Sequence, residues 1–389
     1  MFETIVRRRF LQRLDNIQYG KLLFTSPEGK QHHIQGSLPG PSAELVLKDW
    51  RVIVNLSLKG DIGFAEDYRD GYISTPNLQS LILFCLKNQT CFQAYLTGSF
   101  VYNLVAKLGY LTKRNRVTQS KKNIQAHYDL GNDFYRLWLD PSMTYSSALY
   151  RSDTDSLEAA QHNKYYNILR RLKKQGTILE IGCGWGGFIE QAMQHGNYTI
   201  KGITLSSAQQ QYCRQRLAAY ADKVTIALED YRHQDGTYDA IVSIEMLEAV
   251  GQEYWQCYFD SIAKQLHPEG TAIIQTIIID DALFETYAKG TDMIRTHIFP
   301  GGMLPCLSRL KKHIQAAQLR LVDVNYFGHD YAKTLDEWLF RFNAQQAALL
   351  TLGFDERFQR LWACYLATCS AAFEHQRINV IQLEIRHAR

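Results

Sequence analysis

The sequence lacks the features of disulfide-rich, zinc-binding and membrane-spanning proteins. Its eight cysteines are scattered over 389 residues, and they form neither a C-x-x-C pair nor a Cys/His cluster with zinc-finger spacing. Such a scattered set is typical of reduced thiols in the cytosol. Apolar runs stay far below the roughly 18 residues of a membrane-spanning helix, and residues 1–15 lack the apolar core of a secretory signal. We therefore expect no bound metal, and contact with a membrane only at its surface.

An excess of one charge is also missing. Lysine and arginine number 43 against 39 acidic residues, so the net charge is only +4, which gives no reason to expect nucleic acid binding. Positive charge is concentrated in an arginine-rich start that predicts an amphipathic helix over residues 1–15, and in residues 113–122 (KRNRVTQSKK), which contain no acid. Both segments suit an anionic lipid surface. The alternative is that the first is an ordinary surface helix and the second a solvated linker.

The first part of the chain predicts a small α+β domain over residues 1–112. Residues 45–47 and 52–58 are apolar and β-branched, so they predict strands separated by a charged turn. Residues 60–65 predict a turn that leads into a helix, and residues 78–86 predict a helix with an apolar face. After the basic linker at 113–122, residues 123–389 form the second, larger predicted domain.

Strands and helices alternate regularly from residue 177 onward. Short apolar runs predict strands at 177–181, 198–203, 224–228, 240–243 and 271–279, with helices at 206–220 and 253–266. This alternation indicates an α/β domain with a mostly parallel sheet and helices on both of its faces. Ligands of such sheets bind at the carboxyl ends of the strands.

A glycine-rich loop separates the first of these strands from its helix. Residues 182–187 (GCGWGG) fit G-x-G-x-x-G, which brings the backbone close to a ligand at a helix N-terminus. Nicotinamide enzymes need an acid at the end of the second strand, where this chain has 204–206 (TLS). Glu180 instead precedes the loop and suits an ammonium group or the backbone of another loop, while residues 229–231 (EDY) offer a carboxylate and a ring to an adenine. The pattern favours S-adenosylmethionine over a dinucleotide; a turn without a ligand is the alternative.

Eight motifs in a fixed order identify a family. They are 127–134 (HYDLGNDF), 143–148 (MTYSSA), 182–187 (GCGWGG), 202–206 (GITLS), 243–251 (SIEMLEAVG), 266–270 (LHPEG), 298–302 (IFPGG) and 327–331 (FGHDY). This order resembles the cyclopropane fatty acyl phospholipid synthase and mycolic acid cyclopropane synthase family, strongly so from residue 127 to about 377. Residues 60–71 also resemble the amino-terminal lipid-binding domain of the bacterial phospholipid enzymes.

The resemblance implies a fold and a cofactor site. The fold is a class I methyltransferase with a Rossmann-like sheet and an acyl-chain tunnel, preceded by a lipid-binding domain. The methyl donor is S-adenosylmethionine, with Gln209 toward its ribose or methionine part. The implied cofactor residues are Tyr145, Ser146, Glu180, Gly182, Gly184, Gly186, Thr204, Leu205, Ser206, Gln209, Asp230 and Tyr231.

The implied proton acceptor is altered in this chain. The family resemblance implies a bound bicarbonate held by a Cys backbone, a Glu, a His and a Tyr. Ser147 and Gln275 stand in the Cys and His positions, while Glu248 and Tyr331 remain. A second acid, Glu245, lies three residues before Glu248, and on a helical turn the two carboxylates would share a face. Glu248, in the family's acidic position, is expected to matter most, with Glu245 as a possible direct base or as the partner of an arginine outside the site. Whether bicarbonate is still bound stays open.

The resemblance implies methyl transfer to a cis double bond of an unsaturated acyl chain. The expected product is a cyclopropane fatty acyl chain; the alternatives are a methylene- or methyl-branched chain, an inactive lipid-binding relative and a small-molecule methyltransferase. The expected partner is an unsaturated membrane phospholipid, with a homodimer left open, at the inner face of the cytoplasmic membrane. Aromatic residues after position 323 predict a lipid tunnel or plain core: Tyr326, Phe327, Tyr331, Trp338, Phe340 and Phe342.

Overall fold

The computed structural model describes residues 2–96 and 130–388, so the predicted basic linker and the start of the first motif lie outside the described residues. The described chain divides into two compact units. The first, the amino-terminal unit, combines residues up to 112 with residues 287–300 and 338–377. The second, the seven-stranded unit, takes the remainder. The sequence did not indicate that two later segments join the amino-terminal residues. The lipid-binding and catalytic roles of the two parts stay predictions.

The amino-terminal unit combines helices with a four-stranded sheet of order β2-β1-β3-β4. Its elements are α1 (Phe2–Leu14), β1 (Tyr19–Thr25), β2 (Gln31–Gln35), β3 (Leu38–Leu47), α2 (Arg51–Lys59), α3 (Asp61–Arg69), β4 (Ile73–Ser74), α4 (Leu78–Lys87), α5 (Gln89–Leu96), the π-helix η5 (Ile294–Ile298), α16 (Gln346–Thr351) and α17 (Glu356–Glu374). Its apolar core gathers around Phe24, Trp50 and Phe84.

One predicted strand of this unit is wrong. Residues 52–58 lie in the helix α2, in which Val52 and Ile53 are buried while Leu58 is exposed. The β-branched residues favour a strand by propensity, but burying one side of a helix against the core outweighs that small preference. The helices expected at the chain start, after Gly60 and over 78–86 are confirmed as α1, α3 and α4.

The start of the chain packs on its own unit. Val6, Phe10 and Leu14 of α1 are buried in the core, whereas Arg8 and Arg9 are exposed. The interpretation as an ordinary surface helix is therefore confirmed, and the contact of its arginines with lipid stays a prediction. Within residues 2–96 and 130–388, helices long and apolar enough to cross a membrane do not occur.

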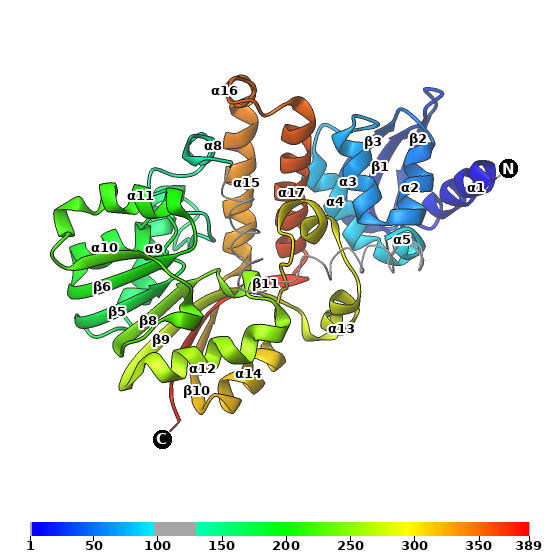
Figure 1. The fold of residues 1–389 in the computed structure, drawn as a ribbon. Helices are drawn as coiled ribbons and strands as arrows, with labels where there is room; N and C mark the ends of the chain where they lie inside the picture. The colour runs from blue at the N-terminus through cyan, green and yellow to red at the C-terminus, as the bar shows by residue number, and fades with distance from the viewer. Residues whose placement is uncertain (1, 97–129, 389) are drawn as a thin grey trace. The chain divides into compact units, whose positions relative to one another are not determined.

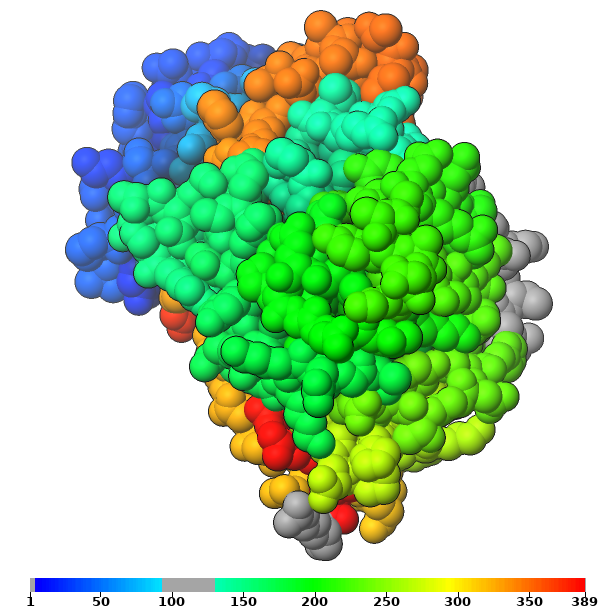
Figure 2. Space-filling view, turned by 90° about the vertical axis from the view of Figure 1, so that its left-hand side faces the viewer, coloured from blue at the N-terminus to red at the C-terminus, as the bar shows by residue number. Residues whose placement is uncertain are grey.

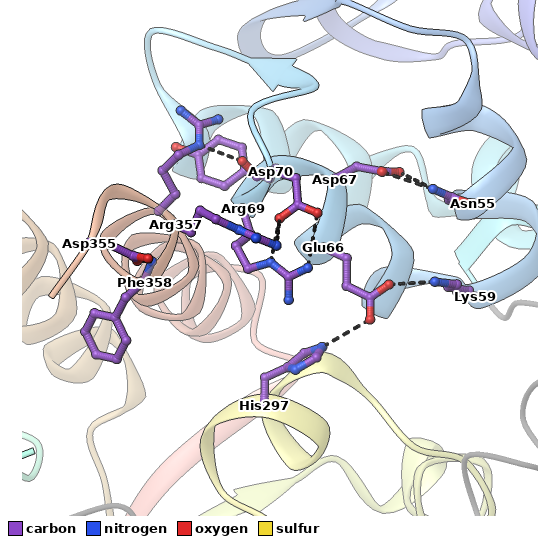
Figure 3. A network of polar contacts seen from close by, with 12 residues as sticks. Asn55, Lys59, Glu66, Asp67, Arg69, Asp70, His297, Asp355, Arg357 and Phe358 are labelled. Atoms are coloured by element: carbon purple, nitrogen blue, oxygen red, sulfur yellow. Dashed lines mark hydrogen bonds and ion pairs between the residues drawn. The ribbon is translucent and has the colours of Figure 1, made fainter.

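Polar contacts attach the later segments to the amino-terminal unit (Figure 3). Glu66 of α3 accepts a hydrogen bond of 2.7 Å from Lys59 of α2, and His297 of η5 lies 3.6 Å from the same carboxylate. At the end of α3, Asp70 accepts a bond of 2.7 Å from Arg357 of α17. Segments that are more than 200 positions apart in sequence are thereby joined within one unit.

The seven-stranded unit is an α/β structure, as predicted (Figure 1). Its elements are α8 (Asn132–Arg136), α9 (Leu157–Leu169), β5 (Gln175–Ile181), α10 (Gly187–His195), β6 (Asn197–Thr204), α11 (Ser207–Arg216), η1 (Ala218–Tyr220), β7 (Val224–Leu228), η2 (Tyr231–His233), β8 (Tyr238–Ile244), η3 (Leu247–Ala249), η4 (Gln252–Tyr254), α12 (Trp255–Gln265), β9 (Leu266–Ile279), α13 (Asp281–Lys289), α14 (Leu307–Ala316), β10 (Leu319–Tyr326), α15 (Gly328–Ala344) and β11 (Ile378–His387). The unit boundaries fall within α13 and α15.

The strand order of this sheet indicates where a ligand would bind. The order is β10-β11-β9-β8-β5-β6-β7, with β5 to β9 parallel and β11 antiparallel to both of its neighbours. The order reverses between β5 and β8, because β6 lies on one side of β5 and β8 on the other. Ile181 pairs with Ser243, so the loops after β5 and β8 leave the same edge of the sheet. That edge is the switch point at which such sheets bind ligands.

Apolar side chains on one face of the sheet pack against a helix. Ile178, Ile200 and Val242 are buried on the strands and pack with Phe188 and Ile189 of α10. Figure 2 views the molecule from the side that carries β6, α10 and α11, whose residues are green there. A rigid, well-packed sheet fixes the strand ends from which the site loops extend.

Candidate active site

The glycines of the loop after β5 serve different purposes. Gly182, Gly184 and Gly186 all have positive φ values, of 82°, 51° and 83°, which glycine adopts without strain. A Cβ on Gly182 would lie 3.0 Å from the Met246 side chain, and one on Gly186 would lie 3.2 Å from Cys213 Sγ. A Cβ on Gly184 would meet no described atom within 4 Å. Gly182 and Gly186 are thus required by packing, whereas Gly184 borders open space.

That open space is a pocket beside the switch point. Ten of the twelve predicted cofactor residues line it: Tyr145, Ser146, Glu180, Gly182, Gly184, Thr204, Leu205, Gln209, Asp230 and Tyr231. Gly186 and Ser206 do not line it, and the Ser206 side chain accepts a bond from the Gln209 backbone at the start of α11. Sequence reasoning missed Trp185 and Arg232, which also line the pocket.

Glu180 is the clearest sign of a ligand in this pocket. Its side chain is buried, and among the described residues its Oε2 atom has no hydrogen-bond partner. Burial raises the pKa of this carboxyl well above its usual value. A buried oxygen without a partner is costly, and a ligand in the pocket with an ammonium or hydroxyl group would satisfy it. The residues present therefore fit S-adenosylmethionine.

The polar groups at the ends of β6 and β7 are arranged by local bonds. Thr204 Oγ1 donates to Gln209 Oε1 at 2.8 Å, which fixes the Gln209 amide at the pocket wall. The Asp230 carboxylate accepts 2.8 Å and 2.6 Å bonds from Arg232, so the carboxylate predicted to meet an adenine is already paired with a guanidinium. Tyr231 beside it is buried and packs edge-on against Tyr258.

Glu245 lies where β8 ends and is held by three donors. Its Oε1 accepts bonds from the Ser147 backbone N–H at 2.8 Å and Gln275 Nε2 at 2.7 Å, and its Oε2 accepts one from the Tyr331 hydroxyl at 2.6 Å. Its backbone φ of +50° lies in the left-handed region, which is unfavourable for a residue other than glycine. Glu245 lines the same pocket as the glycine loop. A strained residue with an organised carboxylate beside a pocket indicates a functional role.

A chain of buried amides sets the direction of the Gln275 contact. Gln382 on β11 donates to Gln275 Oε1 at 3.0 Å, and Asn167 on α9 donates to Gln382 Oε1 at 2.7 Å. Because the Gln275 oxygen is occupied, its NH₂ group is directed to Glu245. Neither Asn167 nor Gln382 was predicted, since the pairing of β9 with β11 cannot be read from local sequence.

Glu248 differs from Glu245 in its surroundings. Its Oε1 accepts bonds from Thr276 Oγ1 at 3.0 Å and from the Ile277 backbone N–H, while its buried Oε2 has no partner among the described residues. Burial, followed by repulsion from Glu245, raises the pKa of Glu248 to about 8. Burial also raises the pKa of Glu245, but the bond from Tyr331 and the charge of Lys164 oppose that rise. The environments favour a neutral Glu248 and an ionised Glu245.

Two expectations about the acids need correction. The carboxylates do not share a helical turn, because Glu248 lies in the short 3-10 helix η3 and Glu245 precedes it in a left-handed conformation. Glu245 is also not directed to an arginine outside the site, since its hydrogen bonds come from Ser147, Gln275 and Tyr331. The five predicted catalytic residues thus lie together, with Ser147 contributing its backbone N–H.

The aromatic segment after residue 323 is mixed in character. Phe327, Tyr331, Trp338 and Phe342 are buried, but Tyr326 is 51% and Phe340 71% exposed. The exposed pair does not fit a tunnel lining. Tyr331 reaches the site through its bond to Glu245, and the acyl-chain tunnel stays a prediction.

Known proteins are similar to this chain in sequence. The mycolic acid cyclopropane synthetase family model matches residues 115–383. The chain is 38% identical over 279 residues to the tuberculostearic acid methyltransferase UfaA1 of Mycobacterium tuberculosis, covering 68% of this chain and 64% of that protein. It is 32% identical over 361 residues to the cyclopropane-fatty-acyl-phospholipid synthase of Escherichia coli, covering 90% of this chain and 88% of that protein.

Solved structures agree with the sequence relatives. The structure of mycolic acid cyclopropane synthase CmaA1 complexed with SAH and CTAB is 32% identical and covers 68% of this chain and 97% of that chain, with a TM-score of 0.64. The likeness to coclaurine N-methyltransferase, at 16% identity and a TM-score of 0.64, shows the fold alone. The matching family, the glycine loop and the fitting pocket lead to one conclusion. The chain belongs to the mycolic acid cyclopropane synthetase family and is a methyltransferase whose methyl donor is S-adenosylmethionine.

Proposed function

We propose that the enzyme transfers a methyl group from S-adenosylmethionine to a cis double bond in an acyl chain of a membrane phospholipid, and that it closes a cyclopropane ring. The Escherichia coli relative supports this substrate, because its likeness extends over 90% of this chain and so reaches into the amino-terminal unit. A methylene- or methyl-branched product is the second candidate. The higher identity to a protein named tuberculostearic acid methyltransferase favours that candidate.

One observation carries the proposal: an organised carboxylate, Glu245, stands in the wall of the cofactor pocket. Methyl transfer to an alkene leaves a carbocation, which becomes a stable product only when a proton is removed. A base must therefore lie beside the methyl donor. Methyl transfer to a neutral amine forms a bond to nitrogen and leaves no carbocation, so it does not require a base that removes a proton from carbon.

The residues of this chain have distinct roles in methyl transfer and proton removal. S-adenosylmethionine, when bound, supplies an electrophilic methyl group at the glycine loop. The pocket orients the double bond toward that group, and orientation is most of what a weak nucleophile needs. Glu245 then accepts the proton that the cation loses. Ser147 N–H, Gln275 and Tyr331 hold its carboxylate in place, and neutral Glu248 avoids a second negative charge beside it.

The product depends on where the cation sits when the proton leaves. If the new methyl group loses a proton while the neighbouring carbon carries the charge, those two carbons bond and the ring closes. If a hydride shifts first, the carbon that bears the methyl group carries the charge, and loss of a methyl proton gives a methylene branch. The same base serves both outcomes, so the acid pair alone does not select between them.

Mass spectrometry of lipids tests the proposal. Vesicles that contain an unsaturated phospholipid are incubated with the enzyme and S-adenosylmethionine, and we expect the acyl chain to gain the mass of one CH₂ group. Fragmentation locates the added carbon, and mild hydrogenation reduces a methylene branch but leaves a ring unchanged. Unmodified lipid, with S-adenosylmethionine bound, would contradict the proposal and identify an inactive lipid-binding relative. Methylation of a soluble amine instead would identify a small-molecule methyltransferase.

We also propose that the enzyme meets the membrane peripherally, at the inner face of the cytoplasmic membrane. Exposed Arg8 and Arg9 support this, together with the basic residues 113–122, which lie outside the described structure. Binding to anionic vesicles should weaken as salt rises, because screening shortens the reach of surface charge to about 8 Å at physiological ionic strength. Sedimentation with vesicles at increasing salt measures this. Salt-independent sedimentation would indicate hydrophobic insertion instead.

A further inference from the structure

One face of α9 is polar and buried. Gln161, Lys164 and Asn167 follow one another at three-residue steps, which places them on the same side of the helix. Their exposed fractions are 0%, 0% and 6%. Polar side chains, and a lysine above all, are expensive to bury without partners. This polar stripe therefore has a specific use.

All three side chains contact residues next to the groups that hold the Glu245 carboxylate. Gln161 Nε2 donates to the Ser146 carbonyl at 3.0 Å, and Lys164 Nζ donates to the Ser146 hydroxyl at 2.6 Å. The next residue, Ser147, gives its backbone N–H to Glu245. Asn167 begins the amide chain that ends at the other donor to Glu245. The helix thus holds two of the three groups that position the carboxylate.

Lys164 differs from its neighbours because it brings a charge. It faces Asp140 after α8, Glu180 on β5 and Glu245 after β8, and its Nζ lies 4.5 Å from the centre of the Tyr165 ring. Burial lowers the pKa of Lys164 to about 7, and the three carboxylates oppose that change. The reverse interaction lowers the pKa of Glu245, which burial raises. The other groups that face Glu245 are the Tyr331 hydroxyl on α15 and Glu248 on η3.

We infer that Lys164 is a positioning residue whose buried ammonium group, fixed on Ser146, keeps Glu245 in its carboxylate form. The inference rests on the proposed function, in which Glu245 accepts the proton. Lys164 acts through Glu245 and Ser146, and it does not line the pocket itself. Its role is to maintain a negative charge at a site that burial would otherwise neutralise.

The test compares pH–rate profiles of kcat/KM for three variants. Lys164→Gln keeps a donor for Ser146 but removes the charge, so the acidic limb of the profile should move to higher pH by about one unit. The sign follows because loss of the positive charge raises the pKa of Glu245. Lys164→Arg keeps the charge and should keep the limb in place. Gln161→Leu is the matched control, because it removes a neutral donor to the same Ser146 and should lower the rate without moving the limb.

The outcomes separate the two proposals. An acidic limb that stays at the wild-type pH in Lys164→Gln, whatever the loss in rate, would overturn the inference and leave Lys164 with a structural role. An equal shift in Gln161→Leu would also overturn it, because the shift would then come from lost geometry. Cofactor affinity measured by calorimetry verifies that each variant folds, and Lys164→Met replaces Lys164→Gln if the latter does not. Absence of acyl-chain methylation by the wild type would instead contradict the proposed function.

Discussion

Replacing Glu245 by glutamine is expected to lower the methylation rate by about 100- to 10,000-fold, the usual contribution of a general base. Cofactor affinity should change little, because the glycine loop and Glu180 stay intact. The amide has nearly the volume of the carboxylate but cannot accept the proton. Turnover of unsaturated phospholipid measures the first effect, and calorimetry with S-adenosylmethionine measures the second.

The backbone at this position offers a sharper variant. Glu245 has a φ of +50°, which glycine adopts without strain, so in Glu245→Gly the relief of backbone strain offsets part of the cost of removing the buried side chain. The variant also leaves Ser147 N–H, Gln275 and Tyr331 as donors around an empty space. We expect activity to be lost and then partly restored by formate or bicarbonate. The wild type, which carries its own carboxylate there, should be unaffected by either anion.

Two results would contradict this assignment. If carbonate-free buffer slowed the wild type and added bicarbonate restored it, an external anion would be the base. If Glu248→Gln lost all activity while Glu245→Gln kept it, the two acids would have to exchange roles. The double variant Glu245→Gln/Glu248→Gln should be about as inactive as Glu245→Gln, and full activity in it would mean that the site has been placed wrongly.

Replacing Gly184 by valine is expected to weaken S-adenosylmethionine binding at least about 100-fold, or roughly 2.7 kcal/mol. A Cβ at Gly184 points into the open pocket, so the valine side chain would occupy space that the ligand needs. The φ of +51° adds strain, because β-branched residues rarely adopt it. Calorimetric titration with S-adenosylmethionine or its product measures the loss.

Gly29→Val is the matched control for this variant. Gly29 has a φ of +79°, and a Cβ there would also meet no described atom within 4 Å, but it lies in the exposed turn between β1 and β2. It should bring a similar backbone strain and leave cofactor affinity unchanged. Unchanged affinity in Gly184→Val would refute the assignment of the loop to the cofactor. A similar loss in both variants would show that strain, rather than the pocket, is responsible.

Local sequence was sufficient to predict the parallel strands of the seven-stranded unit. The strands expected at 177–181, 198–203, 224–228, 240–243 and 271–279 all lie within β5 to β9. Parallel strands buried on both faces form continuous apolar runs, and glycine turns mark their ends, so local composition is informative there. The strand predicted at 52–58 was wrong because a short, half-buried apolar run is compatible with both the strand and the helix periodicity. Packing against the core selected the helix.

The site was predictable where residues are close in sequence. Glu180 lies near the end of β5, and the glycine loop and residues 229–231 follow the ends of β5 and β7, so a parallel sheet brings them to the same edge. The alteration of the acid site could be seen from Ser147, Gln275 and Glu245 alone. The conformation of Glu245 could not be predicted from the sequence. A spacing of three residues between Glu245 and Glu248 is compatible with a helical turn and equally with a left-handed residue that precedes a helix.

By itself, the sequence determined the sheet, the cofactor loop and the identities of the acids, since these depend on neighbours along the chain. Only the tertiary structure decided which acid is organised as a carboxylate. That choice depends on Tyr331 from α15, on Gln275 held by Gln382 of the antiparallel strand β11, and on Lys164 from the buried face of α9. These groups meet because distant elements pack around one strand end, and burial there makes each charge and hydrogen bond count for more than it would in water.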